Sequence, residues 1–273
     1  MSVIISGSFV LNPVVSGGEA VNGDNPLFGY RNLVTSGVLT TTTANPSFPT
    51  VNLANSNTYS RWEGTSIVAD EYITMALATA ELVDYVGIAR HNFYTAQIAV
   101  SLEIFNGSIW VEVVAPFIPG NSGPIMMRFT PQAILSIRVR LQPGTAVPSA
   151  AVVFAGPLLV SQRRLYVGHS PISYSKKTKV VTGRSESGNF LGRIITNSFL
   201  QTTVDLDNLT ADWFRAYLAP FIEAAREDPF FFAWRPLTYP NEVGYSWLMN
   251  DPTPHNQRAN GMMKISLEIG SIA

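Results

Sequence analysis

The sequence predicts a mainly β protein, with a β-sandwich in its first half and a second β-sandwich or barrel, carrying one α-helix, in its second half. Apolar and polar residues alternate in short runs between Gly and Pro turns, which is the pattern of half-buried strands. A helical period of apolar residues stands out in one stretch, near residue 215. The 273 residues favour two domains, because a domain usually has roughly 100–200 residues.

The first half supplies the strands of the N-terminal sandwich. We read residues 1–30 as a lead-in rich in Gly, Asn and Ser, with at most one strand, from Val3 to Leu11. Asn106-Gly107 lies between two apolar runs and predicts a tight hairpin, because both residues tolerate positive φ. We place the sandwich at residues 31–162. Its expected strands are residues 32–43, 72–77, 83–89, 98–104, 109–113, 125–129, 134–141 and 152–160.

The second half, residues 163–273, begins with a predicted hairpin whose loop is 185–189. Thr210 then precedes a helix with an apolar stripe from Phe214 to Ala225, and Pro220 predicts a kink near residues 216–219. Asp228-Pro229 ends this helix. The remaining strands are expected at 174–182, 191–196, 200–206, 230–234 and 262–269.

The composition excludes several classes of function. Charged residues make up 14% of the chain, against roughly 25% in ordinary soluble proteins, which suggests a surface partly covered by neighbouring subunits. A net charge of −1 provides no field for nucleic acid, so no sequence-specific nucleic-acid binding is expected. No basic, apolar leader and no run of roughly 20 apolar residues is present, so we expect synthesis in a cytosol without membrane insertion.

Six short motifs follow one another through the first half. They are Asn45–Leu53, Tyr59-Ser60-Arg61-Trp62, the Ile-x-Met-x-Leu strand at residue 73, Val86–Asn92, the Asn-Gly-Ser-x-Trp run at residue 106 and the Ile-Arg-Val-Arg-Leu run at residue 137. Their order resembles a discoidin-type, galactose-binding-like jelly roll over roughly residues 30–160. In that superfamily these motifs mostly build the sandwich, whereas the ligand loops vary. The resemblance therefore implies a jelly roll more strongly than it implies a sugar.

The order of elements in the second half resembles the tail-tube and distal-tail module of long-tailed bacteriophages. The features that carry this resemblance are the Ser-Glu-Ser-Gly-Asn hairpin, a helix running into Phe-Phe-Phe-Ala-Trp-Arg-Pro, and the terminal strand. Such modules close into rings around the tail channel. The resemblance implies a structural component of a tail tip or baseplate, assembled in the cytoplasm of the host bacterium and carried in the virion. Its partners would be copies of itself and other tail proteins.

Four residues of the first half are candidates for ligand binding: Trp62, Arg90, His91 and Asn92. An aromatic face suits the apolar side of a sugar ring, and polar side chains at a strand end can hydrogen-bond a glycan of a host surface. The alternative is structural. Trp62 then belongs to the core, and the corner from Arg90 to Asn92 hydrogen-bonds its neighbouring loop. Host attachment through the jelly roll is thus the second reading of the function.

Assembly residues are expected in two segments of the second half. Lys176, Lys177 and Arg184 belong to the predicted hairpin, where they either face a channel that carries DNA or form a solvated strand face. Phe230, Phe231 and Phe232 form an apolar strand that is expected to give area and β-edge pairing to neighbours.

Catalytic machinery is not expected. The three histidines lack a second ligand at metal-site spacing, and the chain has no cysteine. A Gly-x-Ser-x-Gly elbow, a phosphate loop and an assignable carboxylate pair are also missing. We therefore expect no enzyme, no metal and no cofactor. A hydrolase is a distant third reading.

Overall fold

The computed structural model describes residues 2–10, 23–165, 168–257 and 261–272. The expected fold class is confirmed, because the chain is mainly β, with sandwich-like antiparallel sheets and one short helical segment. Residues 1 and 11–22 of the expected lead-in lie outside the described residues. Of the strand expected from Val3 to Leu11, only β1 (Ser2–Ile5) is observed: residues 6–10 are not in a strand, and Leu11 lies outside the described residues.

The first module is one folded-over sheet. Among the described residues it has seven strands, in the order β10-β5-β8-β6-β7, with β1 parallel to β8 and β3 antiparallel to β5. A two-stranded sheet, β4-β9, closes one end. The strands are β1, β3 (Val38–Thr41), β4 (Trp62–Glu63), β5 (Glu71–Ala89), β6 (Val100–Phe105), β7 (Trp110–Phe117), β8 (Ile125–Leu141), β9 (Ser149–Ala150) and β10 (Val152–Gly156). Two short turns of 3-10 helix, η1 (Leu33–Thr35) and η2 (Thr50–Ala54), flank β3.

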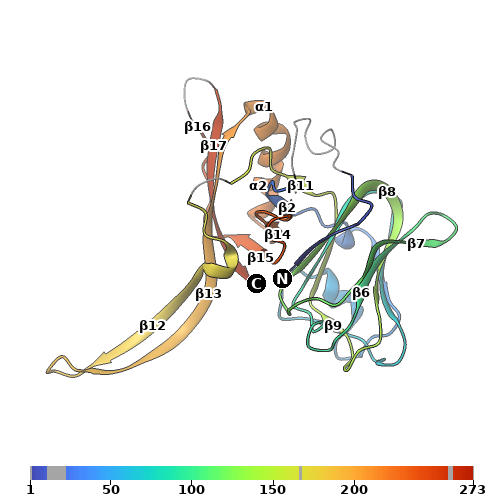
Figure 1. The fold of residues 1–273 in the computed structure, drawn as a ribbon, viewed down its shortest axis with the longest axis horizontal. Coiled ribbons are helices and arrows are strands. Elements are labelled where there is room, and N and C mark those ends of the chain that lie inside the picture. The colour runs from blue at the N-terminus through green and yellow to red at the C-terminus, as the bar shows by residue number, and fades with distance from the viewer. Residues whose placement is uncertain (1, 11–22, 166–167, 258–260, 273) are drawn as a thin grey trace.

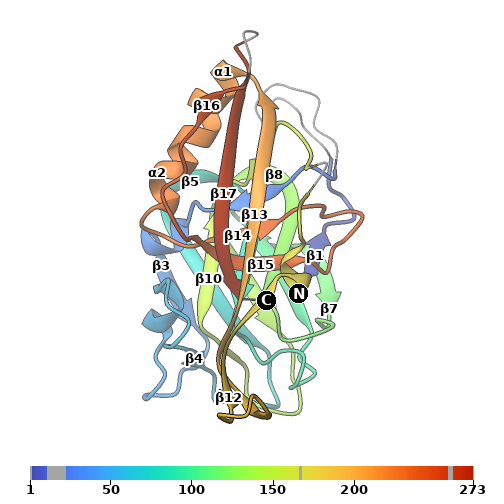
Figure 2. The ribbon, with the colours of Figure 1, turned by 90° about the vertical axis from the view of Figure 1, so that its left-hand side faces the viewer.

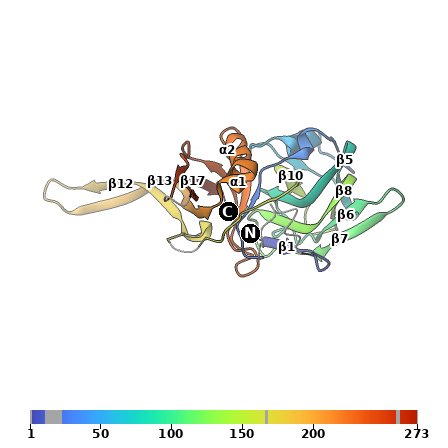
Figure 3. The same cartoon turned by 90° about the horizontal axis from the view of Figure 1, so that it is seen from above.

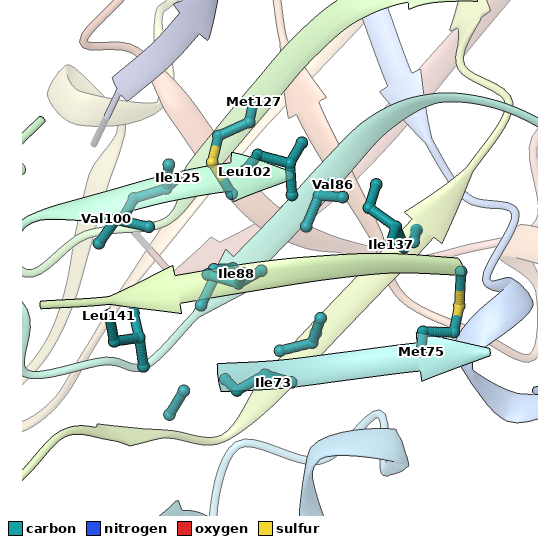
Figure 4. Close-up of a cluster of buried hydrophobic side chains, with 14 of the residues drawn as sticks. Ile73, Met75, Val86, Ile88, Val100, Leu102, Ile125, Met127, Ile137 and Leu141 are labelled. Carbon is teal, nitrogen blue, oxygen red and sulfur yellow. The ribbon is translucent and has the colours of Figure 1, made fainter. Parts of the chain in front are cut away.

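The long strands β5 and β8 contribute to both layers of this sandwich. Their pairing shifts register between Ala76 and Glu81, where the ladder bends. Ile73 and Met75 before the bend, and Val86 and Ile88 after it, therefore point into one buried core (Figure 4). The predicted hairpin is also confirmed: it joins β6 to β7, and Gly107 has a φ of 96°.

The second module is built on a sheet of eight strands within the described residues. Their order is β11-β2-β14-β15-β17-β13-β12, and β16 pairs with β17. The long strands β13 and β17 run antiparallel to one another (Figure 2). The strands are β2 (Leu27–Gly29), β11 (Leu159–Val160), β12 (Lys176–Arg184), β13 (Phe190–Leu209), β14 (Phe230–Ala233), β15 (Val243–Leu248), β16 (His255–Asn256) and β17 (Met263–Ile272); the 3-10 turn η3 (Ile172–Tyr174) precedes β12.

One helical segment covers this sheet. It consists of α1 (Ala211–Trp213), a π-helical turn η4 (Phe214–Leu218) and α2 (Ala219–Ala225). The π turn coincides with the kink predicted from Pro220, which has no N–H and whose ring clashes with the carbonyl one turn earlier in a regular helix. Phe221 packs against Phe28 and Phe230, with ring centroids 4.8 and 5.0 Å apart.

A third core joins the two modules. Phe231 of β14 contacts Phe154 and Tyr245, and its ring lies against Gly87 of the first module, where a Cβ would come within 2.6 Å of it. Gly29 is covered in the same way by the Tyr85 ring. The outer layer of the sandwich is therefore fused to the second sheet over an apolar interface.

That residues 31–162 form a domain of their own remains a prediction. The strand pairing itself crosses these limits, because β2 comes from the expected lead-in and β11 from the end of the expected sandwich, yet both pair in the second sheet. The two modules lie beside one another, with a two-stranded ribbon extending from the second (Figure 1).

Candidate functional site

The ribbon that projects from the second module is formed by β12 and the first half of β13. We call residues 176–198 the arm. Figures 1 and 3 show that it points away from the first module. Every residue of β12 is exposed, and so is every residue of the returning strand up to Ser198 except Gly192. Its loop is the predicted one, with Gly188 at a φ of 84°.

The arm is apolar on both of its faces. Val181 pairs across the strands with Ile194, and Val180 pairs with Ile195. Successive residues of a strand point to opposite faces, so these two pairs lie on opposite sides of the ribbon. Phe190 and Ile194 expose 67% and 69% of their surface, although large apolar residues are usually buried.

Both edges of the arm are open among the described residues. β12 is the last strand of its sheet, and β17 pairs with β13 only from Leu200 onward. Each edge therefore presents backbone N–H and C=O groups to the surroundings. Register shifts occur after Lys179 and after Gly183, and such bulges, together with lysines, are devices that limit uncontrolled edge pairing. The apolar faces are consequently the better surfaces for specific contacts.

The arm is also strongly basic. It carries Lys176, Lys177, Lys179, Arg184 and Arg193 but a single acidic residue, Glu186. The chain as a whole has a net charge of −1, so the positive charge is concentrated here. Of the predicted assembly residues, Lys176, Lys177 and Arg184 all lie on this exposed ribbon.

Phe230, Phe231 and Phe232 occupy a different environment from the one expected. All three are fully buried in β14, which lies between β2 and β15 and has no free edge. Phe230 and Phe232 pack with the helix core, and Phe231 packs in the core between the modules. Their apolar area is therefore used inside the chain, which leaves none of it for a neighbouring subunit.

Three open depressions surround the junction of the two modules. The first, of about 370 Å³, lies between Arg90 and the root of the arm. The second, of about 550 Å³, lies at the end of α2, and we call it the helix-end depression. The third, of about 520 Å³, lies at the end of the sandwich, and we call it the sandwich-end depression. They are contiguous, because Arg90, Tyr59 and Trp247 each line two of them.

Three of the four predicted ligand residues, Arg90, His91 and Asn92, line the third depression, whereas Trp62 does not. Trp62 is fully buried and donates its Nε1–H to the carbonyl of Thr43 at 3.0 Å, so its ring offers no face to a sugar. Asn92 uses its amide group within the chain, donating to the carbonyl of Val147 and accepting from the N–H of Ser149. Arg90 is exposed, at a φ of 55°, and lines the sandwich-end depression.

His91 lies under this corner, stacked on Phe93 with ring centroids 4.6 Å apart. Its Nε2 lies 2.8 Å from the carbonyl of Gly123, and its Nδ1 accepts from the N–H of Phe93 at 3.3 Å. Burial lowers the pKa of His91 to about 4, although the bond to Gly123 favours the charged form. The imidazole is thus neutral and bonded on both sides at neutral pH.

Asp84 is another titratable group whose pKa is strongly shifted. It accepts from the N–H of Leu158 at 2.7 Å within the core, and burial raises its pKa to about 7 despite that bond and the nearby Arg128. It is 4% exposed. Its hydrogen bond to Leu158 positions the backbone immediately before β11.

Among residues 2–10, 23–165, 168–257 and 261–272, no cluster of three His, Asp or Glu residues is suited to hold a metal ion. The described helices are also too short to cross a membrane.

Sequence reasoning missed the importance of the helix end. The sequence predicts a helix stop at Asp228-Pro229 and gives Glu227 no role, yet Glu227 and Asp228 are both exposed on the rim of the helix-end depression. Tyr59, which is 96% exposed, and Trp247 lie on other sides of it. The available signal was the acidic run before Pro229, but its proximity to Tyr59 depends on the packing of the two modules.

No protein-family model and no curated protein matches the sequence. Among solved structures, the chain is similar to a chitosan-binding module of a chitosanase/glucanase from Paenibacillus sp. IK-5, with 17% identity, a TM-score of 0.41 and coverage of 46% of this chain and 98% of that one. It is also similar to the family 32 carbohydrate-binding module of Clostridium perfringens NanJ in complex with galactose, with 14% identity, a TM-score of 0.40 and coverage of 46% and 97%. Both of these structural neighbours are carbohydrate-binding modules, and each is similar to less than half of this chain.

Proposed function

We propose that this chain is a non-enzymatic structural protein that assembles with copies of itself through the arm, as a component of a long-tailed bacteriophage tail tip or baseplate. The observation that carries the proposal is the arm, a basic ribbon with apolar side chains exposed on both faces. An isolated two-stranded hairpin is marginally stable in water at best. Contacts with other chains would stabilise it by burying those side chains.

In this proposal the second module closes into a ring around the tail channel, and other tail proteins adjoin it. The arm leaves the second module on the side opposite the first module (Figure 3). Copies linked through their arms would therefore keep their jelly rolls at the periphery. Assembly would take place in the cytoplasm of the host bacterium, and the protein would end in the virion.

Substitution of the arm tests the self-assembly. The variant Val181→Ser with Ile194→Ser removes one cross-strand apolar pair, and Ile109→Ser with Ile118→Ser is a matched control on exposed residues of the first module. Light scattering after gel filtration should find an oligomer for the wild type and the control, and at least tenfold weaker association for the arm variant. A wild type that stays monomeric at high concentration would contradict the proposal.

Mass spectrometry of purified virions, with antibody labelling of the tail tip, tests the location. Detection at the tip is expected. Absence from virions would overturn the assignment to the tail, whatever the oligomeric state.

A second candidate function is host attachment through a glycan bound in the sandwich-end depression. The observation that favours it is a combination of an exposed ring, Tyr59, with the polar groups of Arg61, Glu63 and Arg90 around one open hollow. Aromatic faces and planar polar groups of this kind suit sugar rings and their hydroxyls.

A glycan array separates this second function from the first. If attachment is correct, the wild type binds defined glycans, and Tyr59→Ala or Arg90→Ala reduces binding at least tenfold. Tyr94→Ala, on an exposed ring outside the depression, is the control. A wild type that binds no glycan would make the jelly roll a structural element only.

A further inference from the structure

The helix-end depression combines aromatic walls with an acidic rim. Tyr59, Tyr245 and Trp247 supply rings, and the end of α2 supplies Glu227 and Asp228. Its volume of about 550 Å³ lies within the roughly 300–1,000 Å³ of typical ligand sites, which is enough for several side chains.

The one basic residue on this rim is already neutralised. Arg226 forms ion pairs with Glu223, at 2.8 Å, and with Asp251, at 3.4 Å. Glu227 and Asp228 therefore leave the rim with negative charge. The negative charge of Asp228 also acts on the Tyr245 ring in the wall of the depression. Burial and this charge both raise the pKa of the Tyr245 phenol.

The arm has the complementary chemistry. It presents five basic residues against one acidic residue, beside aliphatic side chains such as Leu191 and Ile194 that expose more than half of their surface. Aliphatic groups match the aromatic walls, and the lysines match the rim carboxylates. Charge complementarity of this kind selects partners and fixes register.

We propose that the arm of one copy docks in the helix-end depression of a second copy. This inference rests on the proposed self-assembly and specifies its partner surface. The occupant belongs to another copy because each arm extends away from its own body (Figure 1). A contact between two different surfaces is heterologous, so repetition generates a closed ring when the rotation closes and a filament when it does not.

Cysteine cross-linking tests the docking directly, because the chain has no native cysteine. Leu191→Cys on the arm and Ser56→Cys at the depression are placed in separate chains, which are then mixed under mild oxidation. A disulfide-linked pair is expected. Leu191→Cys mixed with Ser108→Cys, which lies on an exposed turn of the first module, should give at least tenfold less cross-link.

Mixed variants test the direction of the contact. Glu227→Lys with Asp228→Lys reverses the rim, and these exposed positions at a helix C-terminus tolerate cations well. A second chain has residues 177–197 replaced by an Asn-Gly turn, so it retains only the depression. Each variant alone should be monomeric, whereas the mixture should form pairs that do not grow further. Glu112→Lys is the surface-charge control.

The outcomes distinguish this inference from the function on which it rests. If the wild type and the reversed-rim variant assemble equally, the arm docks elsewhere, and the inference fails while self-assembly stands. If the wild type is monomeric at high concentration, both fail. Cross-linking to Ser56→Cys together with two-chain pairs in the mixture supports both.

Discussion

At the scale of single residues, the Phe231 ring lies directly against Gly87, so the two modules pack closely at this point. A Cβ at Gly87 would lie 2.6 Å from two ring carbons of Phe231. Extra atoms in a packed core cost roughly 1–3 kcal/mol. Gly87→Ala should therefore lower the free energy of unfolding by about that amount, as measured by urea denaturation.

Gly120 provides the matched control for this prediction. No atom lies within 4 Å of a Cβ built there, so Gly120→Ala should change stability by less than about 0.5 kcal/mol. Equal effects of the two substitutions would show that the close approach of the sheets has no energetic consequence.

His91 should make the protein less stable in acid. Its pKa falls from 6.5 to about 4 on folding, and a tenfold change in proton affinity is worth about 1.4 kcal/mol. The neutral side chain thus contributes full stability above pH 6.5. That contribution, about 3 kcal/mol, is lost as the pH falls from 6.5 to 4.

Chemical denaturation at several pH values, with His91→Gln beside the wild type, measures this contribution. The stability difference between the two proteins should shrink or reverse on acidification from pH 7 to pH 4. A difference that stays constant over this window would contradict the depressed pKa.

The roles of single residues were the hardest part to predict from sequence. Trp62 follows a polar stretch that resembles an exposed loop, and His91 follows the exposed Arg90 at the end of a buried strand. The carbonyls of Thr43 and Gly123 nevertheless reach them from distant segments. Tyr59, three residues before Trp62, is the exposed ring instead. Burial of a loop residue depends on which distant segments pack over it, and the local sequence pattern does not predict those segments.

At the scale of elements, the arm contributes no side chain to the hydrophobic cores of the folded body. Its apolar residues belong to none of the three buried cores. Two variants that are expected to be monomeric can therefore be compared: one in which an Asn-Gly turn replaces residues 177–197, and Val181→Ser with Ile194→Ser. Their melting temperatures should differ by no more than about 3 °C. Differential scanning calorimetry at low concentration measures this. A much larger drop would place the arm in the folding core.

Elements were predicted well wherever local chemistry decides them. The turn at Asn106-Gly107, the loop at residues 185–189 and the kink before Pro220 all depend on neighbouring residues. The continuous strand β13 was instead read as two strands. Its continuity depends on pairing with β12 at one end and β17 at the other, which are contacts between residues distant in sequence.

At the scale of the whole molecule, the core between the modules predicts cooperative unfolding. The core between the modules contains Tyr85 and Phe154 from the first module and Phe231 from the second. Separation of the modules would expose these rings to water, so neither module keeps its native surroundings without the other. One thermal transition is expected. Phe231→Ala should destabilise the whole chain by about 3–5 kcal/mol, the usual cost of removing a buried aromatic ring. Two separated transitions in the wild type would contradict this.

The sequence predicted two β-rich halves correctly but not how they are joined. The predicted boundary between the two halves lies between residues 162 and 163. In the structure, β2 and β11 pair in the second sheet, and Gly29 and Gly87 allow the sheets to approach closely. Three-residue and two-residue strands are too short to show a periodicity, which is why their sheet could not be assigned from the sequence.

Hydrogen–deuterium exchange over a concentration series tests the central claim, that the arm is the assembly element, most directly. Amides of residues 176–198 should be poorly protected in dilute solution and become at least tenfold more protected as concentration rises, while those of β5 and β8 stay constant. Arm amides that exchange at the same rate at every concentration, in a chain that nevertheless oligomerises, would contradict the account.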